Sequence, residues 1–211
     1  MGFFSRYFLR GATADPLCAL SGKTRIGIAG CGPSVGVTHF SIMTACYAVS
    51  VLRRRTALLE WNQSGDFARL QEVYGKKNVM DSTGKTFNIL DIYFFREAGR
   101  EQLRECLERD FCMVIIDFGV FREDIRDDFL QCDRRFLVCS ASEWQLPGFA
   151  AFLSGNKEQG CRYEYFSAFG KRENTGMAER FLKVSIRQIP LSLDAFVITG
   201  ESLSFFGKFL K

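Results

Sequence analysis

The sequence predicts an α/β fold in which one mostly parallel, twisted sheet of about seven strands lies between two layers of helices. Short apolar runs alternate with longer segments of helical periodicity along the 211 residues. Several short runs are apolar at nearly every position, as in parallel sheets that helices cover on both faces. Apolar residues make up 47% of the chain and charged residues 25%, which allows a large core and excludes a disordered chain.

Each element follows from its composition and periodicity. Seven short runs rich in β-branched, aromatic or leucine residues are predicted strands: Arg25–Ala29, Thr56–Glu60, Phe87–Phe94, Cys112–Asp117, Arg135–Cys139, Tyr163–Ala168 and Val184–Ile189. The segments with helical spacing are Thr38–Arg53, Asp66–Tyr74, Glu97–Asp110, Arg122–Gln131, Glu143–Leu153, Met177–Leu182 and Leu203–Leu210. No repeat or long linker divides residues 23–211, so we expect one domain there, preceded by a basic and aromatic segment at residues 1–22.

The sequence also bears on the cellular compartment. The longest mostly apolar run, Phe40–Leu52, is shorter than the ~18–20 residues that a membrane-spanning helix needs. Arg6 and Arg10 interrupt what would be the apolar core of a signal peptide. No two of the eight cysteines are spaced as C-x-x-C, so we expect buried free thiols. These observations predict a cytoplasmic protein.

The segment after the first predicted strand has the form of a phosphate-binding loop. Residues 24–40 read TRIGIAGCGPSVGVTHF, a strand followed by a glycine-bearing loop and a helix. Gly36 and Thr38 fit the consensus G-x-x-x-x-G-K-[ST], but Val37 replaces its lysine and Cys31 its first glycine. Backbone amides at such a helix N-terminus favour an anion. A tight turn that binds no ligand is the alternative.

Two further segments are in register with this loop. EWNQSGD at Glu60–Asp66 follows the second strand, and DFG at Asp117–Gly119 follows the fourth. Together with SVGVTHF, CDRRFLVCSASEWQL and IRQIPLSLDAF, they resemble the MinD/ParA family of P-loop ATPases, whose motifs are K-G-G-x-G-K-T-T, D-x-D-x-x-G and an apolar strand ending in Asp. The resemblance covers roughly residues 24–200 and implies a P-loop NTPase fold. The lysine-poor loop is most similar to the divergent TadZ/CpaE branch, which is associated with pilus assembly and polar localisation.

The resemblance implies a site for ATP and Mg²⁺. Thr38 would bind Mg²⁺ through its hydroxyl, and Asp117 would hold the ion through water. Glu60 stands in for the carboxylate that orients the attacking water, so Glu60 and Asp117 are the implied catalytic residues. The residues implied to surround the nucleotide phosphates are Gly30, Gly32, Ser34, Val35, Gly36, Val37, Thr38 and His39.

The sequence departs from the family pattern in its charges. Gly32 and Val37 stand where the family has lysines, and Asn62 replaces its second aspartate. A hydrogen bond to a charged group contributes roughly 1.5–3 kcal/mol, so the loss of both lysines weakens phosphate binding on the order of a hundredfold or more. We therefore expect weak ATP binding with slow or no hydrolysis, and whether the chain is an enzyme stays open.

These features predict a regulatory or localising protein that recruits protein partners, such as pilus or secretion machinery. Two alternatives stay open: an active Mg-dependent ATPase switch, and a pseudo-NTPase scaffold that binds no nucleotide. A homodimer is compatible with the family, although the missing lysine makes a nucleotide-sandwich dimer less secure. The net charge of +4 is too mild to predict nucleic-acid binding.

Both ends of the chain combine aromatic and basic residues, as MGFFSRYFLR and LSFFGKFLK. On helices, these segments would be amphipathic anchors for an anionic membrane surface, and MinD-type relatives carry such a tail at the C-terminus. The alternative for Leu203–Leu210 is that its phenylalanines pack on the sheet. The protein is therefore expected either free in the cytoplasm or peripheral at the inner face of the membrane.

Overall fold

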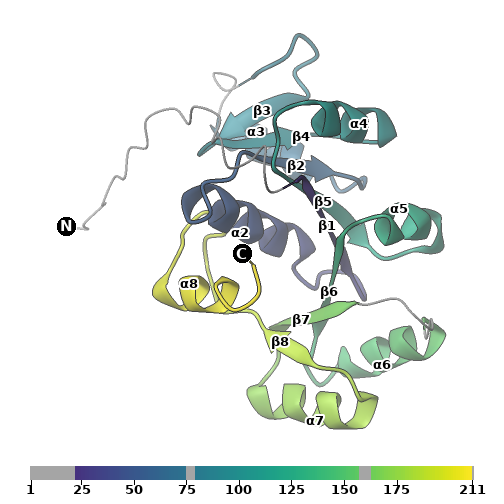
Figure 1. Ribbon diagram of the computed structural model, residues 1–211. Helices are drawn as coiled ribbons and strands as arrows, with labels where there is room; N and C mark the ends of the chain where they lie inside the picture. The colour runs from purple at the N-terminus through teal and green to yellow at the C-terminus, as the bar shows by residue number, and fades with distance from the viewer. Residues whose placement is uncertain (1–21, 75–78, 157–162, 211) are drawn as a thin grey trace.

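In the computed structural model, which describes residues 22–74, 79–156 and 163–210, eight strands form one sheet (Figure 1). The strands are β1 (Thr24–Gly30), β2 (Thr56–Glu60), β3 (Thr86–Ile89), β4 (Ile92–Phe95), β5 (Met113–Val120), β6 (Arg134–Ser140), β7 (Glu164–Phe169) and β8 (Ile186–Gln188). Their order across the sheet is β3-β4-β2-β5-β1-β6-β7-β8, and all neighbours are parallel except β3 and β4. The predicted mostly parallel sheet is confirmed.

The prediction of a single strand at Phe87–Phe94 is wrong. This segment is the antiparallel hairpin of β3 and β4, which adds an eighth strand to the sheet. Leu90 and Asp91 form its two-residue turn with φ angles of 49° and 63°. Left-handed angles at both turn positions give the turn a twist that suits a hairpin, and they are usually supplied by Asn-Gly or Asp-Gly. Because neither pair is present, the sequence carries no turn signal here.

Helices cover both faces of the sheet, which confirms the three predicted layers (Figure 1). They are α2 (Val37–Ser50), α3 (Asp66–Tyr74), α4 (Arg100–Glu108), the short 3₁₀ helix η2 (Glu123–Ile125), α5 (Arg126–Leu130), α6 (Leu146–Gly155), α7 (Arg172–Leu182) and α8 (Gly200–Phe206). One core is formed with side chains from α2, α3 and α8, and the other with side chains from α4 and α5. Helices α6 and α7 share a smaller cluster beside β6, β7 and β8.

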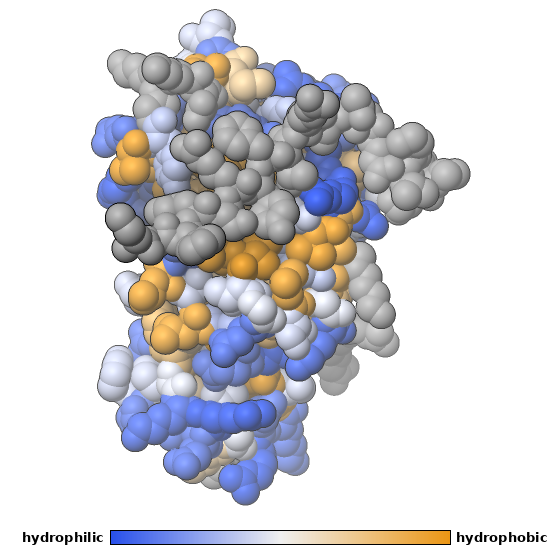
Figure 2. Space-filling model, turned by 90° about the vertical axis from the view of Figure 1, so that its left-hand side faces the viewer, coloured by the Kyte–Doolittle hydropathy of each residue, from blue (hydrophilic) through white to orange (hydrophobic). Residues whose placement is uncertain are grey.

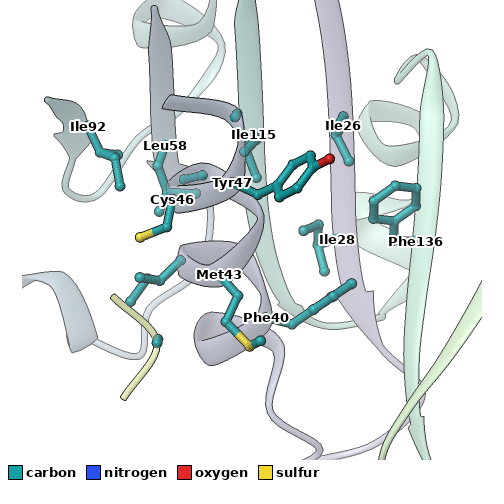
Figure 3. Close-up of a cluster of buried hydrophobic side chains, with 14 of the residues drawn as sticks. Ile26, Ile28, Phe40, Met43, Cys46, Tyr47, Leu58, Ile92, Ile115 and Phe136 are labelled. Atoms are coloured by element: carbon teal, nitrogen blue, oxygen red, sulfur yellow. The ribbon is translucent and has the colours of Figure 1, made fainter. Parts of the chain in front are cut away.

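Helix α2 is buried along most of its length because it lies between the sheet and α8. Its side chains Phe40 and Tyr47 point toward the sheet residues Ile28 and Phe136, and Met43 belongs to the same buried cluster (Figure 3). Burial of a large apolar side chain contributes roughly 1.5–3 kcal/mol, so this cluster fixes the helix firmly. The N-terminus of α2, and the loop that leads into it, are thereby held in a defined position at the edge of the sheet.

The C-terminal segment packs into the same core. Phe205, Phe206 and Leu210 are buried, and the ring of Phe206 stacks on Tyr47 with 5.0 Å between centroids. The Thr199 hydroxyl caps α8 by accepting a hydrogen bond from the Ser202 amide at 3.1 Å. This burial favours packing over membrane anchoring for the C-terminal phenylalanines. Residues 1–21 lie outside the described residues, so the N-terminal segment stays a prediction.

Membrane spans and thiols are the two other expectations from the sequence. No helix in the described ranges is long and apolar enough to cross a membrane. Cys31, Cys46, Cys106, Cys132 and Cys139 are free thiols, as expected. Cys112 is disulfide-bonded, so the expectation of free thiols is wrong at that position.

Candidate functional site

The carboxyl ends of β1, β2 and β5 meet at one edge of the sheet, where a hollow of about 560 Å³ opens. Ligands of open α/β sheets bind at such an edge, where the connections leave the strands. We call this space the loop hollow. Its lining residues are Gly32, Ser34, Val35, Gly36, Val37, Thr38, His39, Asn62, Gln63, Ser64, Asp66, Phe118, Gly119, Val120 and Arg122.

The loop between β1 and α2 has a backbone suited to an anion. Ser34 and Gly36 have left-handed φ angles of 55° and 91°, at two positions where the family motif has glycine. Gly36 is the N-cap of α2, and no side chain caps the helix. The first amides of α2, at Val37, Thr38 and His39, therefore lack helical partners in the wall of the hollow. Free amides at a helix N-terminus attract negative charge.

Apolar packing holds this loop from below. Val35 and Val37 are 4% and 8% exposed and belong to the α2 core. A Cβ atom on Gly30 would lie 2.8 Å from Val35 Cγ2 and 2.9 Å from Val37 Cγ2, so only glycine fits there. Gly32, in contrast, has open space where its Cβ would be. Of the predicted phosphate-contacting residues, Gly30 is thus part of the support, and the seven from Gly32 to His39 line the hollow.

Asp117 lies immediately behind the lining residues Asn62 and Gly119. Its Oδ1 accepts hydrogen bonds from the Gly119 amide at 2.9 Å and Asn62 Nδ2 at 3.1 Å. Its Oδ2 is buried and has no hydrogen-bond partner among the described residues. Burial raises the pKa of Asp117 to about 6, while the nearby Thr38 hydroxyl and the Gly119 amide lower it and the charges of Glu60 and Asp66 raise it further. An uncompensated buried carboxylate of this kind favours a bound cation.

Thr38 and Asp66 lie together beside this carboxylate. The Thr38 hydroxyl is 3.4 Å from Asp66 Oδ2, a long hydrogen bond, and it is also close enough to Asp117 to lower the pKa of that carboxyl. Thr38 and Asp117, the two predicted Mg²⁺ residues, are therefore brought together. Asp66 starts α3 and adds to the site residues that the sequence predicts, and it directly follows Gly65 of the second motif.

Glu60 has different surroundings from those expected of a catalytic base. Its Oε1 accepts hydrogen bonds from the Phe67 amide at 3.1 Å and the Ser64 hydroxyl at 3.3 Å, and its Oε2 accepts one from the Glu97 amide at 3.4 Å. It lines a second hollow of about 600 Å³, which adjoins the loop hollow through Asn62, Gln63 and Arg122. Glu60 thus holds the start of α3 and the chain after β4 in place.

His39 joins the loop hollow to the chain after β8. It is partly buried, and this burial lowers its pKa below the usual 6.5, with the charge of Asp194 and the Ser192 backbone acting in the opposite direction. A neutral imidazole is also what a helix N-terminus favours. His39 therefore offers the hollow a polar group rather than a permanent charge.

Sequence reasoning missed Arg122, which lines both hollows. Strand β5 continues past Asp117 to Val120, and Val120 pairs with Gly30 of β1. The Phe121 amide then donates a hydrogen bond to the Gly30 carbonyl at 2.9 Å, which places Arg122 beside the loop. Because this position depends on strand pairing, the local sequence, which predicted the start of a helix, gave no signal for it.

No protein-family model matches the sequence, and no curated protein is similar to it in sequence. Solved structures are similar in fold. A ParA family ATPase from Chlorobium tepidum TLS has 15% identity, with 87% of this chain and 89% of that chain covered and a TM-score of 0.55. A plasmid partition protein from Borrelia burgdorferi B31 bound to AMPPNP has 12% identity, coverage of 90% and 97%, and a TM-score of 0.60. MinD from Aquifex aeolicus has 13% identity, with 81% of this chain and 83% of that chain covered and a TM-score of 0.57.

These identities are low, whereas the coverage is high in both directions. They therefore show the fold, which is that of the MinD/ParA type of P-loop ATPase. The fold implied by the sequence motifs is confirmed.

Proposed function

We propose that this protein is a regulatory or localising protein that binds Mg·ATP weakly in the loop hollow, hydrolyses it slowly or not at all, and acts by recruiting protein partners. One observation carries the proposal. The loop keeps an anion-binding backbone beside the buried carboxylate of Asp117, whose Oδ2 accepts no hydrogen bond from the described residues, yet the described lining residues include no lysine. Such a site retains the geometry for phosphate and lacks much of the charge.

The residues present fit Mg²⁺ and nucleotide phosphates. The Thr38 hydroxyl and Asp117 Oδ2 are oxygen donors, which Mg²⁺ prefers, and Asp117 would hold the ion through water. Bound Mg²⁺ supplies positive charge to the phosphates and offsets the burial of this carboxylate. The α2 amides and the loop backbone would contact the phosphates. One neighbour in fold carries AMPPNP, which supports a nucleotide as the ligand.

Slow turnover follows from two features. The lysines that stabilise charge during phosphoryl transfer are replaced by Gly32 and Val37. Glu60, the residue implied to orient water, is engaged through both oxygens and lines the second hollow. The active ATPase switch would need Glu60 to leave these hydrogen bonds, so the observed contacts favour a binding protein.

Partner recruitment is supported by exposed apolar residues. Trp144 and Leu191 are each 80% exposed and Leu193 is 97% exposed; they follow β6 and β8 at the same edge as the loop hollow. Figure 2 shows further hydrophobic residues across the middle of the face on the α8 side. A neighbour in fold is MinD in a complex with MinC. A TadZ/CpaE-like role at pilus or secretion machinery, a homodimer, and membrane contact through residues 1–22 are the finer parts of this proposal.

The decisive experiment is a calorimetric titration with Mg·ATP, with and without EDTA, together with a phosphate-release assay. We expect Mg-dependent binding and slow or absent release. Val37→Lys restores a charge at the α2 N-terminus and should tighten binding by about tenfold or more. Val73→Lys, on the exposed surface of α3, is the matched control and should have no effect.

Each alternative gives a different result. Absence of Mg·ATP binding at millimolar concentration would favour the empty scaffold, and rapid phosphate release would favour the active switch. If Val37→Lys, folded as shown by its melting temperature, bound no more tightly than Val73→Lys, the alignment of the loop with the family motif would be wrong.

A further inference from the structure

The loop hollow presents a problem of charge. Asp66 lines it, and Asp117 lies just behind its wall, so a phosphate would meet two carboxylates. The loop supplies amides and no lysine. Mg²⁺ would compensate part of this negative charge, but the phosphate oxygens that the ion does not reach still need a partner. A permanent cation close to the loop would meet that need.

Arg122 is the one lysine or arginine among the described residues that line the hollow. Its backbone is fixed, because Val120 pairs with Gly30 and the Phe121 amide bonds to the Gly30 carbonyl at 2.9 Å. Nearby Gly32 has open space where a side chain would be. The guanidinium therefore has room to move over the loop at the point where the family's lysine is missing.

The present partner of Arg122 does not prevent this movement. Its Nε and Nη2 atoms each lie 3.0 Å from an oxygen of Asp124. Both side chains are exposed, at 58% and 66%, and exposed ion pairs contribute little to stability. A phosphate in the hollow carries more charge than one carboxylate and accepts the same bidentate pair of hydrogen bonds from a guanidinium. It can thus displace Asp124.

We propose that Arg122 supplies the positive charge that the loop lacks and contacts the phosphate oxygens of the bound nucleotide. This inference rests on the proposed function and adds a cation on a different strand from the loop. Asp124 is its partner in the empty site and competes with the ligand. The contact is to phosphate alone, so it does not depend on the base.

The test compares four variants in titrations with Mg·ATP and with Mg·tripolyphosphate, which has no base. Arg122→Gln should weaken both by about tenfold to a hundredfold, the usual effect of one charge-assisted hydrogen-bonding group. Arg122→Lys should retain part of the affinity. Asp124→Asn should tighten binding by a few-fold because the competing carboxylate is removed. Arg126→Gln, on the next turn of the chain and outside both hollows, is the matched control and should stay within about twofold.

The outcomes separate the two proposals. If the wild-type chain binds Mg·ATP and Arg122→Gln binds equally well, the role of Arg122 is wrong and the proposed function stands. If the wild-type chain binds neither probe, the proposed function fails and this inference falls with it. Opposite shifts in Arg122→Gln and Asp124→Asn, with unchanged melting temperatures, support the inference.

Discussion

Two buried carboxylates lie side by side on neighbouring strands, and they differ in what surrounds their oxygens. Glu60 of β2 and Asp117 of β5 are register partners and are 1% and 0% exposed. Both oxygens of Glu60 accept hydrogen bonds from amides or a hydroxyl. Asp117 has one oxygen in hydrogen bonds and one without a partner in the described part of the chain. The two carboxylates are equally buried, but only Glu60 has hydrogen bonds to both of its oxygens.

This difference indicates separate roles. A buried carboxylate whose hydrogen bonds are complete stabilises the structure around it, whereas one that lacks partners lowers stability until a ligand compensates it. Glu60 is thus committed to the fold, and Asp117 remains available to a cation. The following substitutions test this contrast, first at the two carboxylates and then in the loop above them.

The largest effect is expected for Asp117→Asn. The folded-state pKa of about 6 lies above the ordinary 3.8, so the unfolded chain ionises at a lower pH than the folded protein. The free energy of unfolding therefore falls as the pH rises from about 4 to 6. A difference of about two pKa units corresponds to about 3 kcal/mol. The variant should therefore be more stable than wild type by about 2–3 kcal/mol at pH 7.5 and nearly equal at pH 4, and it should lose Mg-dependent ATP binding.

Urea denaturation at both pH values measures this effect. Asp127→Asn, at an exposed position of α5, is the control and should stay within about 0.5 kcal/mol of wild type. A destabilised Asp117→Asn protein at pH 7.5 would mean that the carboxylate is already compensated within the fold.

Glu60→Gln should act in the opposite direction. An amide has one acceptor oxygen, so either the Phe67 or the Glu97 amide would face an NH₂ group instead. We expect a loss of about 2 kcal/mol in the free energy of unfolding, with Mg·ATP affinity nearly unchanged. Glu72→Gln, exposed on α3, provides the comparison. A Glu60→Gln protein of normal stability that binds ATP poorly would place Glu60 in the ligand site.

Much of this site could be predicted from the sequence because parallel strands bring their carboxyl ends to one edge. The loop after β1 and Asn62 after β2 follow two such ends, Asp117 lies near the third, and the structure brings them together. The roles of individual groups could not be predicted in the same way. The partners of Glu60 include Glu97, which is far along the chain, and Arg122 reaches the hollow only because β5 extends to pair with Gly30.

The fold shows the same limit at the β3–β4 hairpin. Its apolar residues predict β structure but not the reversal at Leu90 and Asp91, because packing of both strands against the core imposes a turn that the residues do not favour. Local preference gave the element type, and tertiary contacts gave its direction.

The loop offers a smaller test, of whether its shape depends on apolar support. Gly30→Ala places a Cβ against Val35 and Val37 and should cost about 1–3 kcal/mol and weaken ATP binding. Gly32→Ala meets open space and should change stability by less than about 0.5 kcal/mol. Equal melting temperatures for the two variants would show that Val35 and Val37 do not constrain the loop.

The smallest expected effect is a change in the pKa of His39, which reports on charge close to this residue in the loop hollow. It is the only histidine in the chain, so its imidazole NMR signals need no assignment by mutation. Its pKa should lie below 6.5 because burial disfavours the charged form, and removal of the Asp194 charge in Asp194→Asn should lower it further. The sign for stability is opposite to that of Asp117: with the folded-state pKa below the unfolded value, His39 costs stability as the pH falls below about 6.5.

Saturation with Mg·ATP should raise the pKa of His39 by up to about one unit, since phosphate at the α2 N-terminus favours the imidazolium. If bound nucleotide left the pKa of His39 unchanged, its phosphates would lie away from α2. A different ligand would then be needed to explain why Asp117 is available to a cation while Glu60 is held by the fold.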